Sequence, residues 1–197
     1  GAAIVVFAAG TAQEPGETRL DLLKRNAAIL AELLPGIVRF APDAILVIAA
    51  NPVDVLTHLA VKRARLPPAR IIGAGTILDT ARFRVLLGLH LDIDPQSVHA
   101  WVVGEHGDSE VPLWSGANVA GMSLAAYSAA NGIPFDDTVR MRIAVETRDA
   151  AARIIARKGS TYYAIGAGLL RIVEAILRDE SAVLSVSTPV KGILGLP

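Results

Sequence analysis

Three short apolar segments alternate with helical patterns in the first part of the chain, and this alternation constrains the fold more than any other feature. The segments AAIVVFA (2–8), AILVIAA (44–50) and RIIGAG (70–75) are separated by helical patterns at 20–40 and 53–66. Apolar strands joined by crossover helices are typical of a parallel sheet that is covered on both faces. We therefore expect an α/β fold with its functional residues just past the carboxyl ends of the strands.

The character of the sequence changes after Gly75, and we place a domain boundary there. Before it, Thr18 and Asp21 are three residues apart and predict the N-terminal cap of the helix at 20–40. After it, the sequence predicts helices at 76–91, about 135–157 and 161–178, and strands at 97–103, 110–121 and 182–190. We therefore expect part of a parallel-sheet domain at 1–75, followed by an α+β domain at 76–197.

The charge balance and the absence of cysteine limit the function classes. Lys and Arg together number 19, the same as Asp and Glu, so we expect no nucleic-acid partner and no anionic-membrane partner. Without cysteine, the chain has no disulfide framework, no thiolate metal site and no cysteine nucleophile. No apolar run in the sequence reaches the length that spans a bilayer.

Two loops that follow predicted strands carry polar residues suited to a site. The loop AAGTAQEPGETRL (8–20) is rich in Gly and Pro and contains Arg19, which a closing lid would bring over an anionic or carbonyl substrate. A solvated arginine in the first turn of a helix is the simpler interpretation. Asn51, in ANPVD (50–54), either opens an ordinary turn or donates its amide to a substrate oxygen.

The helical segment LDTARFR (78–84) carries one acid and two arginines. Asp79 and Arg82 are three residues apart and share a helix face, whereas Arg84 lies about 200° round from Arg82, on nearly the opposite face. One arginine can therefore grip a carboxylate with its planar fork, while the other faces solvent or a partner subunit. A surface ion pair between Asp79 and Arg82 is the alternative interpretation.

His106 lies in GEHGDSE (104–110), directly after an apolar run. A histidine works as an acid–base group when a hydrogen-bond acceptor orients one ring nitrogen. Glu105, Asp108 and the more distant Asp79 are candidates for this acceptor, and spacing does not decide between them. The four histidines include no H-x-x-x-H pair, and no G-x-S-x-G elbow occurs, so we expect neither a zinc site nor a serine hydrolase.

Five segments, in this order, resemble the bacterial-type L-lactate dehydrogenases of the lactate/malate dehydrogenase family: AGTAQEPGETRLDL, NPVD, GTILDTARFR, GEHGDSE and KGSTYYAIG. The resemblance covers nearly the whole chain. It implies the second part of a Rossmann-type parallel-sheet domain at 1–75, followed by an α+β substrate and catalytic domain at 76–197. It also implies reversible, NADH-dependent reduction of pyruvate to L-lactate by a cytoplasmic homo-oligomer, expected to be a tetramer.

The resemblance implies a role for each matched residue. His106 corresponds to the proton donor and acceptor, Asp79 to its orienting partner, and Arg19 to the arginine that polarises the substrate carbonyl. Arg82 corresponds to the clamp on the substrate carboxylate. The other matched residues contact the substrate or the NAD cofactor: Gly10, Gln13, Asn51, Thr161 and Ile165.

Two further implications concern specificity and regulation. Malate dehydrogenases of the family carry an arginine at the position of Gln13, so the neutral Gln13 favours pyruvate over a dicarboxylic 2-oxoacid. Arg84 and His99 correspond to positions where bacterial members bind fructose 1,6-bisphosphate between subunits. Two unrelated surface residues are the alternative interpretation of this pair.

Two features of the family do not occur in the sequence. It contains no G-x-G-x-x-G fingerprint, and it stops at GILGLP where the family continues. We therefore expect a partial chain that starts within the dinucleotide-binding domain. The alternatives are a malate or other 2-hydroxy-acid dehydrogenase, and an inactive fragment that cannot bind NAD.

Overall fold

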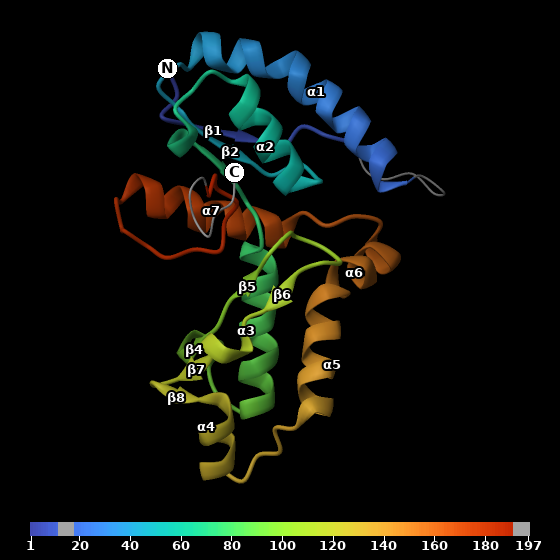
Figure 1. Ribbon diagram of the computed structural model, residues 1–197, viewed down its shortest axis with the longest axis vertical. Helices are drawn as coiled ribbons and strands as arrows, with labels where there is room; N and C mark the ends of the chain where they lie inside the picture. Colours follow the sequence, from blue (N-terminus) through green and yellow to red (C-terminus); the bar gives the residue numbers. More distant parts are fainter. Residues whose placement is uncertain (12–17, 191–197) are drawn as a thin grey trace. The chain divides into compact units, whose positions relative to one another are not determined.

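The computed structural model describes residues 1–11 and 18–190, and the chain divides into two compact units. The first unit comprises Gly1–Gly75, Leu169–Ala182 and the stretch from Val186 onward. The second unit comprises Thr76–Gly168 and Val183–Ser185. Figure 1 shows the elements of both units, coloured along the sequence.

A three-stranded parallel sheet with the order β1-β2-β3 organises the first unit. The unit contains β1 (Ile4–Phe7), α1 (Arg19–Phe40), β2 (Ile45–Ile48), α2 (Val53–Arg63), the short 3-10 helix η1 (Pro68–Arg70) and β3 (Ile71–Gly73). In the register, Phe7 pairs with Ile48, and Ile48 pairs with Gly73. The carboxyl ends of the three strands therefore lie at one edge, and the predicted parallel sheet is confirmed.

The strands of this sheet differ in burial. In the central strand β2, Leu46, Val47 and Ile48 are at most 1% exposed, as expected for a strand covered on both faces. Val6 in β1 is 40% exposed, because β1 lies at the edge of the described sheet and has a strand on one side alone. The prediction of two covered faces therefore holds for β2 and is wrong for β1.

The predicted cap of α1 is confirmed. Thr18 Oγ1 accepts a hydrogen bond from the Asp21 N–H at 3.2 Å and donates one to Asp21 Oδ2 at 2.5 Å. The hydroxyl of Thr18, and then Lys24, lower the pKa of Asp21, which places a negative charge at the positive end of the helix dipole. Arg19 is the first residue of α1, and its side chain lies outside the described part of the chain.

The second unit is built around α3 (Ile77–Leu91), which packs against α5, β4 and β5. Its strands are only two residues long and form two antiparallel sheets, β4-β7-β8 and β5-β6. They are β4 (Val98–His99), β5 (Val102–Val103), β6 (Val111–Pro112), β7 (Asn118–Val119) and β8 (Met122–Ser123). The other elements are η2 (Pro95–Ser97), η3 (Trp114–Gly116), α4 (Leu124–Ala130), α5 (Asp137–Arg148), α6 (Ala150–Lys158) and α7 (Tyr163–Leu177), which continues into the first unit. Among the helices that the structure describes, none has the length and apolar character needed to cross a membrane.

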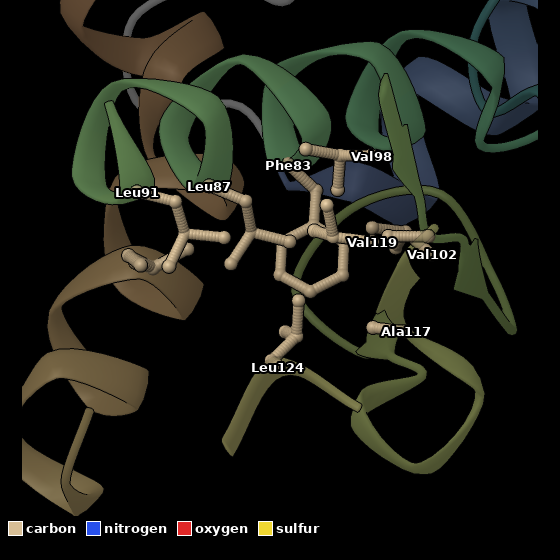
Figure 2. Close-up of a cluster of buried hydrophobic side chains, with 10 residues drawn as sticks. Phe83, Leu87, Leu91, Val98, Val102, Ala117, Val119 and Leu124 are labelled. Carbon is tan, nitrogen blue, oxygen red and sulfur yellow. The ribbon is translucent and has the colours of Figure 1, made fainter. Parts of the chain in front are cut away.

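An apolar stripe along α3 forms the core of the second unit (Figure 2). Phe83, Leu87 and Leu91 recur every four residues and are at most 2% exposed. The ring of Phe83 meets that of Trp114 edge-on, with centroids 4.8 Å apart. Other buried residues complete the cluster: Val98, Ala100, Val102, Ala117, Val119, Leu124 and Ile143. This packing fixes the rotation of α3 and therefore the direction of its polar side chains.

The segment 97–103, predicted as one strand, is divided between two sheets, so that prediction is wrong. Side chains of α3 satisfy the backbone groups where it divides. Arg84 Nε donates to the carbonyl oxygen of Ala100 at 2.7 Å, and Thr80 Oγ1 accepts from the Val102 N–H at 2.9 Å. Because these groups bond to a helix, they do not continue a β ladder.

Other predicted elements also need correction. The extended segment 110–121 is β6 and β7 separated by η3, and the helix at about 135–157 is α5 and α6 meeting at Asp149, an aspartate that favours helix ends over interiors. The segment 182–190 is not a strand, and Ser187 is its one residue that forms a β-bridge, to Gly73. The two residues pack closely there, since a Cβ on Gly73 would lie 2.9 Å from the Ser187 Cβ. Helix α4 was not predicted from the sequence; its N-terminal cap is Ser123, whose hydroxyl accepts a hydrogen bond from the Ala126 N–H at 3.2 Å.

Candidate active site

His106 and Asp79 come together from two elements of the second unit. Asp79 lies in the first turn of α3, four residues before Phe83 and on the same buried face, and its side chain is 1% exposed. His106 lies between β5 and β6, with Nδ1 2.6 Å from Asp79 Oδ2. An ionised carboxylate can only accept a hydrogen bond, so Nδ1 carries the proton of this contact.

Hydroxyl groups at the N-terminal end of α3, one on its N-cap residue and one in its first turn, hold the β5-β6 hairpin against Asp79. Thr76 Oγ1 donates to the Val102 carbonyl oxygen at 2.6 Å, and Thr80 Oγ1 accepts from the Val102 N–H at 2.9 Å. Both threonines are buried and lie on either side of Asp79 in the sequence. Val102, four residues before His106, is thus tied to the helix that carries the carboxylate.

Two glycines turn the chain on either side of His106. Gly104 has φ of 86° and Gly107 has φ of 120°, values that residues with a Cβ rarely adopt. The nearest acids in the sequence, Glu105 and Asp108, are exposed, and Glu105 accepts a hydrogen bond from a serine in the same turn. Of the three candidate acceptors, the structure brings Asp79 to Nδ1 of His106.

Arg82 contacts the second oxygen of the same carboxylate. Its Nη1 lies 3.1 Å from Asp79 Oδ1, and its side chain is 16% exposed. Asp79 therefore contacts Arg82 through Oδ1 and His106 through Oδ2. Arg82 also lines a cavity of about 400 Å³, together with residues of α3, α5, α6 and α7: Leu78, Ala81, Val85, Leu86, Glu146, Ala150, Arg153 and Ala164.

Glu110 is a third acid–base group of this cluster, and the sequence analysis did not single it out. One Glu110 oxygen, one Asp79 oxygen and a ring nitrogen of His106 all lie within 4.8 Å of one another. Both Glu110 oxygens are buried, and no donor among the described residues has good hydrogen-bond geometry to either. Burial, and then the charge of Asp79, raise the pKa of Glu110 to about 7, while His106, the Gly107 backbone and Arg82 act in the opposite direction.

Two more of the predicted residues lie at the start of α7. Thr161 is exposed and precedes the helix, and Ile165 is half-buried within it, directly after Ala164 of the cavity wall. No described contact joins either of them to His106 or Asp79, so their place in the site stays a prediction.

Arg84 has different partners from Arg82, as their angular separation on α3 predicts. Its Nε donates to the Ala100 carbonyl oxygen at 2.7 Å, and its guanidinium lies over the Trp101 ring, 5.4 Å from the centroid. The side chain is half-buried, and burial lowers its pKa. His99, directly before Ala100, is exposed.

In the first unit, the loops after β1 and β2 are joined by a residue that the sequence analysis missed. Asn26 in α1 is 1% exposed. Its Oδ1 accepts from the Thr11 N–H at 2.8 Å, and its Nδ2 donates to the Asn51 carbonyl oxygen at 2.7 Å. A Cβ on Gly10 would lie 3.3 Å from the Asn26 amide, so a larger residue there would require Asn26 to shift by a few tenths of an ångström. A buried asparagine within a helical pattern is the signal that could have identified it.

Two predicted residues cannot be placed in the site. Gln13 lies outside the described residues, and so does the side chain of Arg19. Their roles remain predictions from the sequence.

Residues 1–73 match the NAD binding domain of lactate/malate dehydrogenase, and residues 76–197 match the alpha/beta C-terminal domain. The chain is 57% identical over 187 residues to an L-lactate dehydrogenase of Thermus aquaticus, covering 95% of this chain and 60% of that protein. It is 53% identical over 196 residues to an L-lactate dehydrogenase of Allorhizobium ampelinum, covering 100% of this chain and 63% of that protein.

The solved structures that resemble this chain are also lactate dehydrogenases. The minor L-lactate dehydrogenase of Enterococcus mundtii, in a ligand-bound form, has a TM-score of 0.91 and 44% identity, covering 97% of this chain and 60% of that one. A lactate dehydrogenase from a Medee basin deep-sea metagenome library has a TM-score of 0.92 and 42% identity, covering 100% and 62%. The chain spans about 60% of the length of these relatives. It belongs to the lactate/malate dehydrogenase family.

Proposed function

We propose that the protein is an L-lactate dehydrogenase, which interconverts pyruvate and L-lactate with NADH and NAD⁺. The observation that carries this proposal is the contact of His106 with Asp79 beside Arg82. This contact brings together a proton donor (His106), the carboxylate that orients it (Asp79) and a guanidinium that can bind a substrate carboxylate (Arg82). The identity of 57% to a relative named L-lactate dehydrogenase supports the same reaction.

In the reduction, His106 supplies the proton. Bound NADH would supply the hydride for C2 of pyruvate. His106 donates the Nε2 proton of its imidazolium to the carbonyl oxygen. The products are lactate and neutral His106, which regains a proton from water. Because Asp79 is buried and hydrogen-bonded to Nδ1, it holds the ring orientation and stabilises the cationic form.

Two arginines bind the negative charges of the reaction. Nη1 of Arg82 donates to Asp79, and the other N–H groups of the guanidinium can hold the pyruvate carboxylate in two parallel hydrogen bonds. We assign Arg19, the first residue of α1, to the negative charge that develops on the carbonyl oxygen. We assign Thr161 to the substrate pocket.

The first unit fits a nucleotide cofactor at the carboxyl edge of its parallel sheet, where ligands of such sheets bind. Gly10 and Asn51 follow neighbouring strands, and the buried Asn26 ties their loops together. The side of Gly10 that lacks a Cβ packs against Asn26, which holds this loop close to the carboxyl end of β1. We assign Gly10, Asn51 and Ile165 to the NAD site, with the Asn51 amide also reaching the substrate oxygen.

Replacing Gln13 with arginine is expected to shift the preference from pyruvate toward oxaloacetate by about 10²-fold in the ratio of kcat/KM values. The added cation pairs with the second carboxylate of oxaloacetate, a charge that glutamine leaves uncompensated. Steady-state NADH oxidation with each acid measures the ratio in the full-length protein. Gln96→Arg is the matched control, because it places the same change on an exposed residue of η2. An unchanged ratio in Gln13→Arg would overturn the assignment of Gln13.

We further propose that Arg84 and His99 bind fructose 1,6-bisphosphate at a two-fold axis between subunits. The bond from Arg84 to Ala100 places the arginine beside the strand that carries the exposed His99. Two such pairs across a two-fold axis offer one cationic pair to each phosphate. This proposal requires a homo-oligomer, and we propose a cytoplasmic tetramer.

Fructose 1,6-bisphosphate is expected to lower KM for pyruvate by about 5-fold or more, the usual size of an allosteric coupling. His99→Gln should remove the response, whereas His58→Gln, on an exposed position of α2, should keep it. The measurement is a titration of KM with the sugar bisphosphate in the full-length protein. A wild-type KM that does not respond would contradict the site.

A further inference from the structure

Glu110 has no part in the mechanism above, although its carboxyl group lies in the same cluster as His106 and Asp79. We propose that Glu110 acts through the His106–Asp79 pair as a positioning residue, and that the charge on its carboxyl group sets the pH range over which the imidazole keeps its proton. The inference rests on the proposed function, in which His106 exchanges a proton with the substrate.

The β5-β6 connection folds back so that Glu110 returns to His106. The Glu110 N–H donates to the Gly107 carbonyl oxygen at 3.1 Å, closing a turn immediately after the histidine. Glu110 is then followed by Val111, which pairs with Val103 in the hairpin. The four-residue separation of Glu110 from His106 therefore becomes a distance within 4.8 Å between their polar atoms.

The carboxyl group of Glu110 has few hydrogen-bond donors near it among the described residues, and the Gly107 backbone is the one that lowers its pKa. Both oxygens are buried, and no donor in the described part of the chain bonds to either with good geometry. Glu105 in the same turn differs, since it is exposed and accepts from Ser109 Oγ at 3.0 Å. A buried carboxyl group without such bonds lowers stability. The other groups near its carboxyl group are the charged and ionisable side chains of the cluster.

Charged groups face Glu110 from three elements. Asp79 and Arg82 come from α3, His106 comes from its own hairpin, and Arg148, held by Asp149 at 2.9 Å, acts from the end of α5. Burial and the repulsion by Asp79 outweigh the cations and raise the pKa of Glu110 to about 7. The charge on Glu110 therefore changes in the neutral range, where an imidazole also titrates.

The two titrations are coupled through their charges. When Glu110 ionises as the pH rises, its negative charge favours the imidazolium form of His106 and delays loss of the histidine proton. When Glu110 is protonated, this attraction is absent. Glu110 therefore extends pyruvate reduction, which needs imidazolium, to higher pH, and it delays lactate oxidation, which needs neutral imidazole.

The test is Glu110→Gln in the full-length protein, because glutamine keeps the size and removes the charge. The pKa of His106, followed by NMR of its ring, is expected to fall by about one unit, the effect of removing an opposite charge at this distance. Glu105→Gln is the matched control, on the same turn but exposed, and should leave the His106 pKa unchanged. An unchanged His106 pKa in Glu110→Gln would overturn the proposal.

The pH profiles give a second readout that a purely structural role would not move. In Glu110→Gln the alkaline limit of kcat/KM for pyruvate reduction should move to lower pH by the same interval as the His106 pKa. If the variant does not fold, the test is an NMR titration of the Glu110 carboxyl group in the wild-type protein. A Glu110 pKa at its ordinary value near 4.5 would contradict the coupling. Absence of pyruvate reduction by the wild type would overturn the proposed function, while the NMR titration still tests Glu110 independently.

Discussion

Replacing His106 with glutamine is expected to lower kcat/KM for pyruvate reduction by about 10²- to 10⁴-fold, the usual contribution of a positioned proton donor. Glutamine can still hydrogen-bond to Asp79, which lies 2.6 Å from Nδ1 of the histidine. It carries no exchangeable charge at neutral pH, so the carbonyl oxygen loses its proton source. The measurement is the initial rate of NADH oxidation over a range of pyruvate concentrations, with the full-length protein.

His58→Gln controls for loss of a histidine elsewhere, because His58 is exposed on α2 of the first unit. It should leave kcat/KM unchanged. NADH binding, followed by fluorescence, should also be unaffected in His106→Gln, which separates a chemical defect from a folding defect. A His106→Gln protein that keeps more than about a tenth of wild-type kcat/KM would show that another group supplies the proton.

Replacing Asp79 with asparagine is expected to produce a loss of similar size, about 10²- to 10⁴-fold in kcat. Asparagine is isosteric but neutral, so it no longer stabilises the imidazolium and can turn its amide toward Nδ1, which selects the wrong tautomer. The corresponding change in a Ser-His-Asp triad costs about 10⁴-fold for this reason. The same substitution also removes the partner of Arg82, 3.1 Å away, so KM for pyruvate should rise as well.

Asp137→Asn is a close control for Asp79→Asn. Asp137 pairs with Arg140 at 3.3 Å with the same three-residue spacing, but its side chain is 98% exposed. Because an exposed pair contributes little, kcat and thermal stability should be nearly unchanged. If Asp79→Asn folds and retains wild-type kcat, the buried carboxylate does not act on the histidine.

Much of the fold could be predicted from local patterns, and the errors have identifiable causes. The strands of the parallel sheet are short apolar runs, and Thr18 carries the sequence signal of a helix cap. The short strands of the second unit carry no comparable signal. There, Arg84 and Thr80 of α3 bond to the backbone of the segment at 97–103 and divide it, a tertiary effect that periodicity does not reveal.

The candidate site was only partly predictable because its residues are distant in the sequence. Asp79 is 27 residues from His106, yet it occupies the apolar stripe that continues through Phe83. An acid at a core position of a helix is itself a signal, since a buried carboxylate needs a partner. Glu110 was missed because its burial depends on how the hairpin folds back. Asn26 was missed for the corresponding reason in the first unit.

The central claim is that His106 and Asp79 act as one proton-exchanging unit in pyruvate reduction. A double-mutant cycle of His106→Gln and Asp79→Asn, measured as kcat for NADH-dependent pyruvate reduction, tests it most directly. We predict that the double variant is no slower than His106→Gln alone, because the carboxylate acts through the imidazole. Losses that multiply in the double variant, or a wild type that does not reduce pyruvate, would contradict the account.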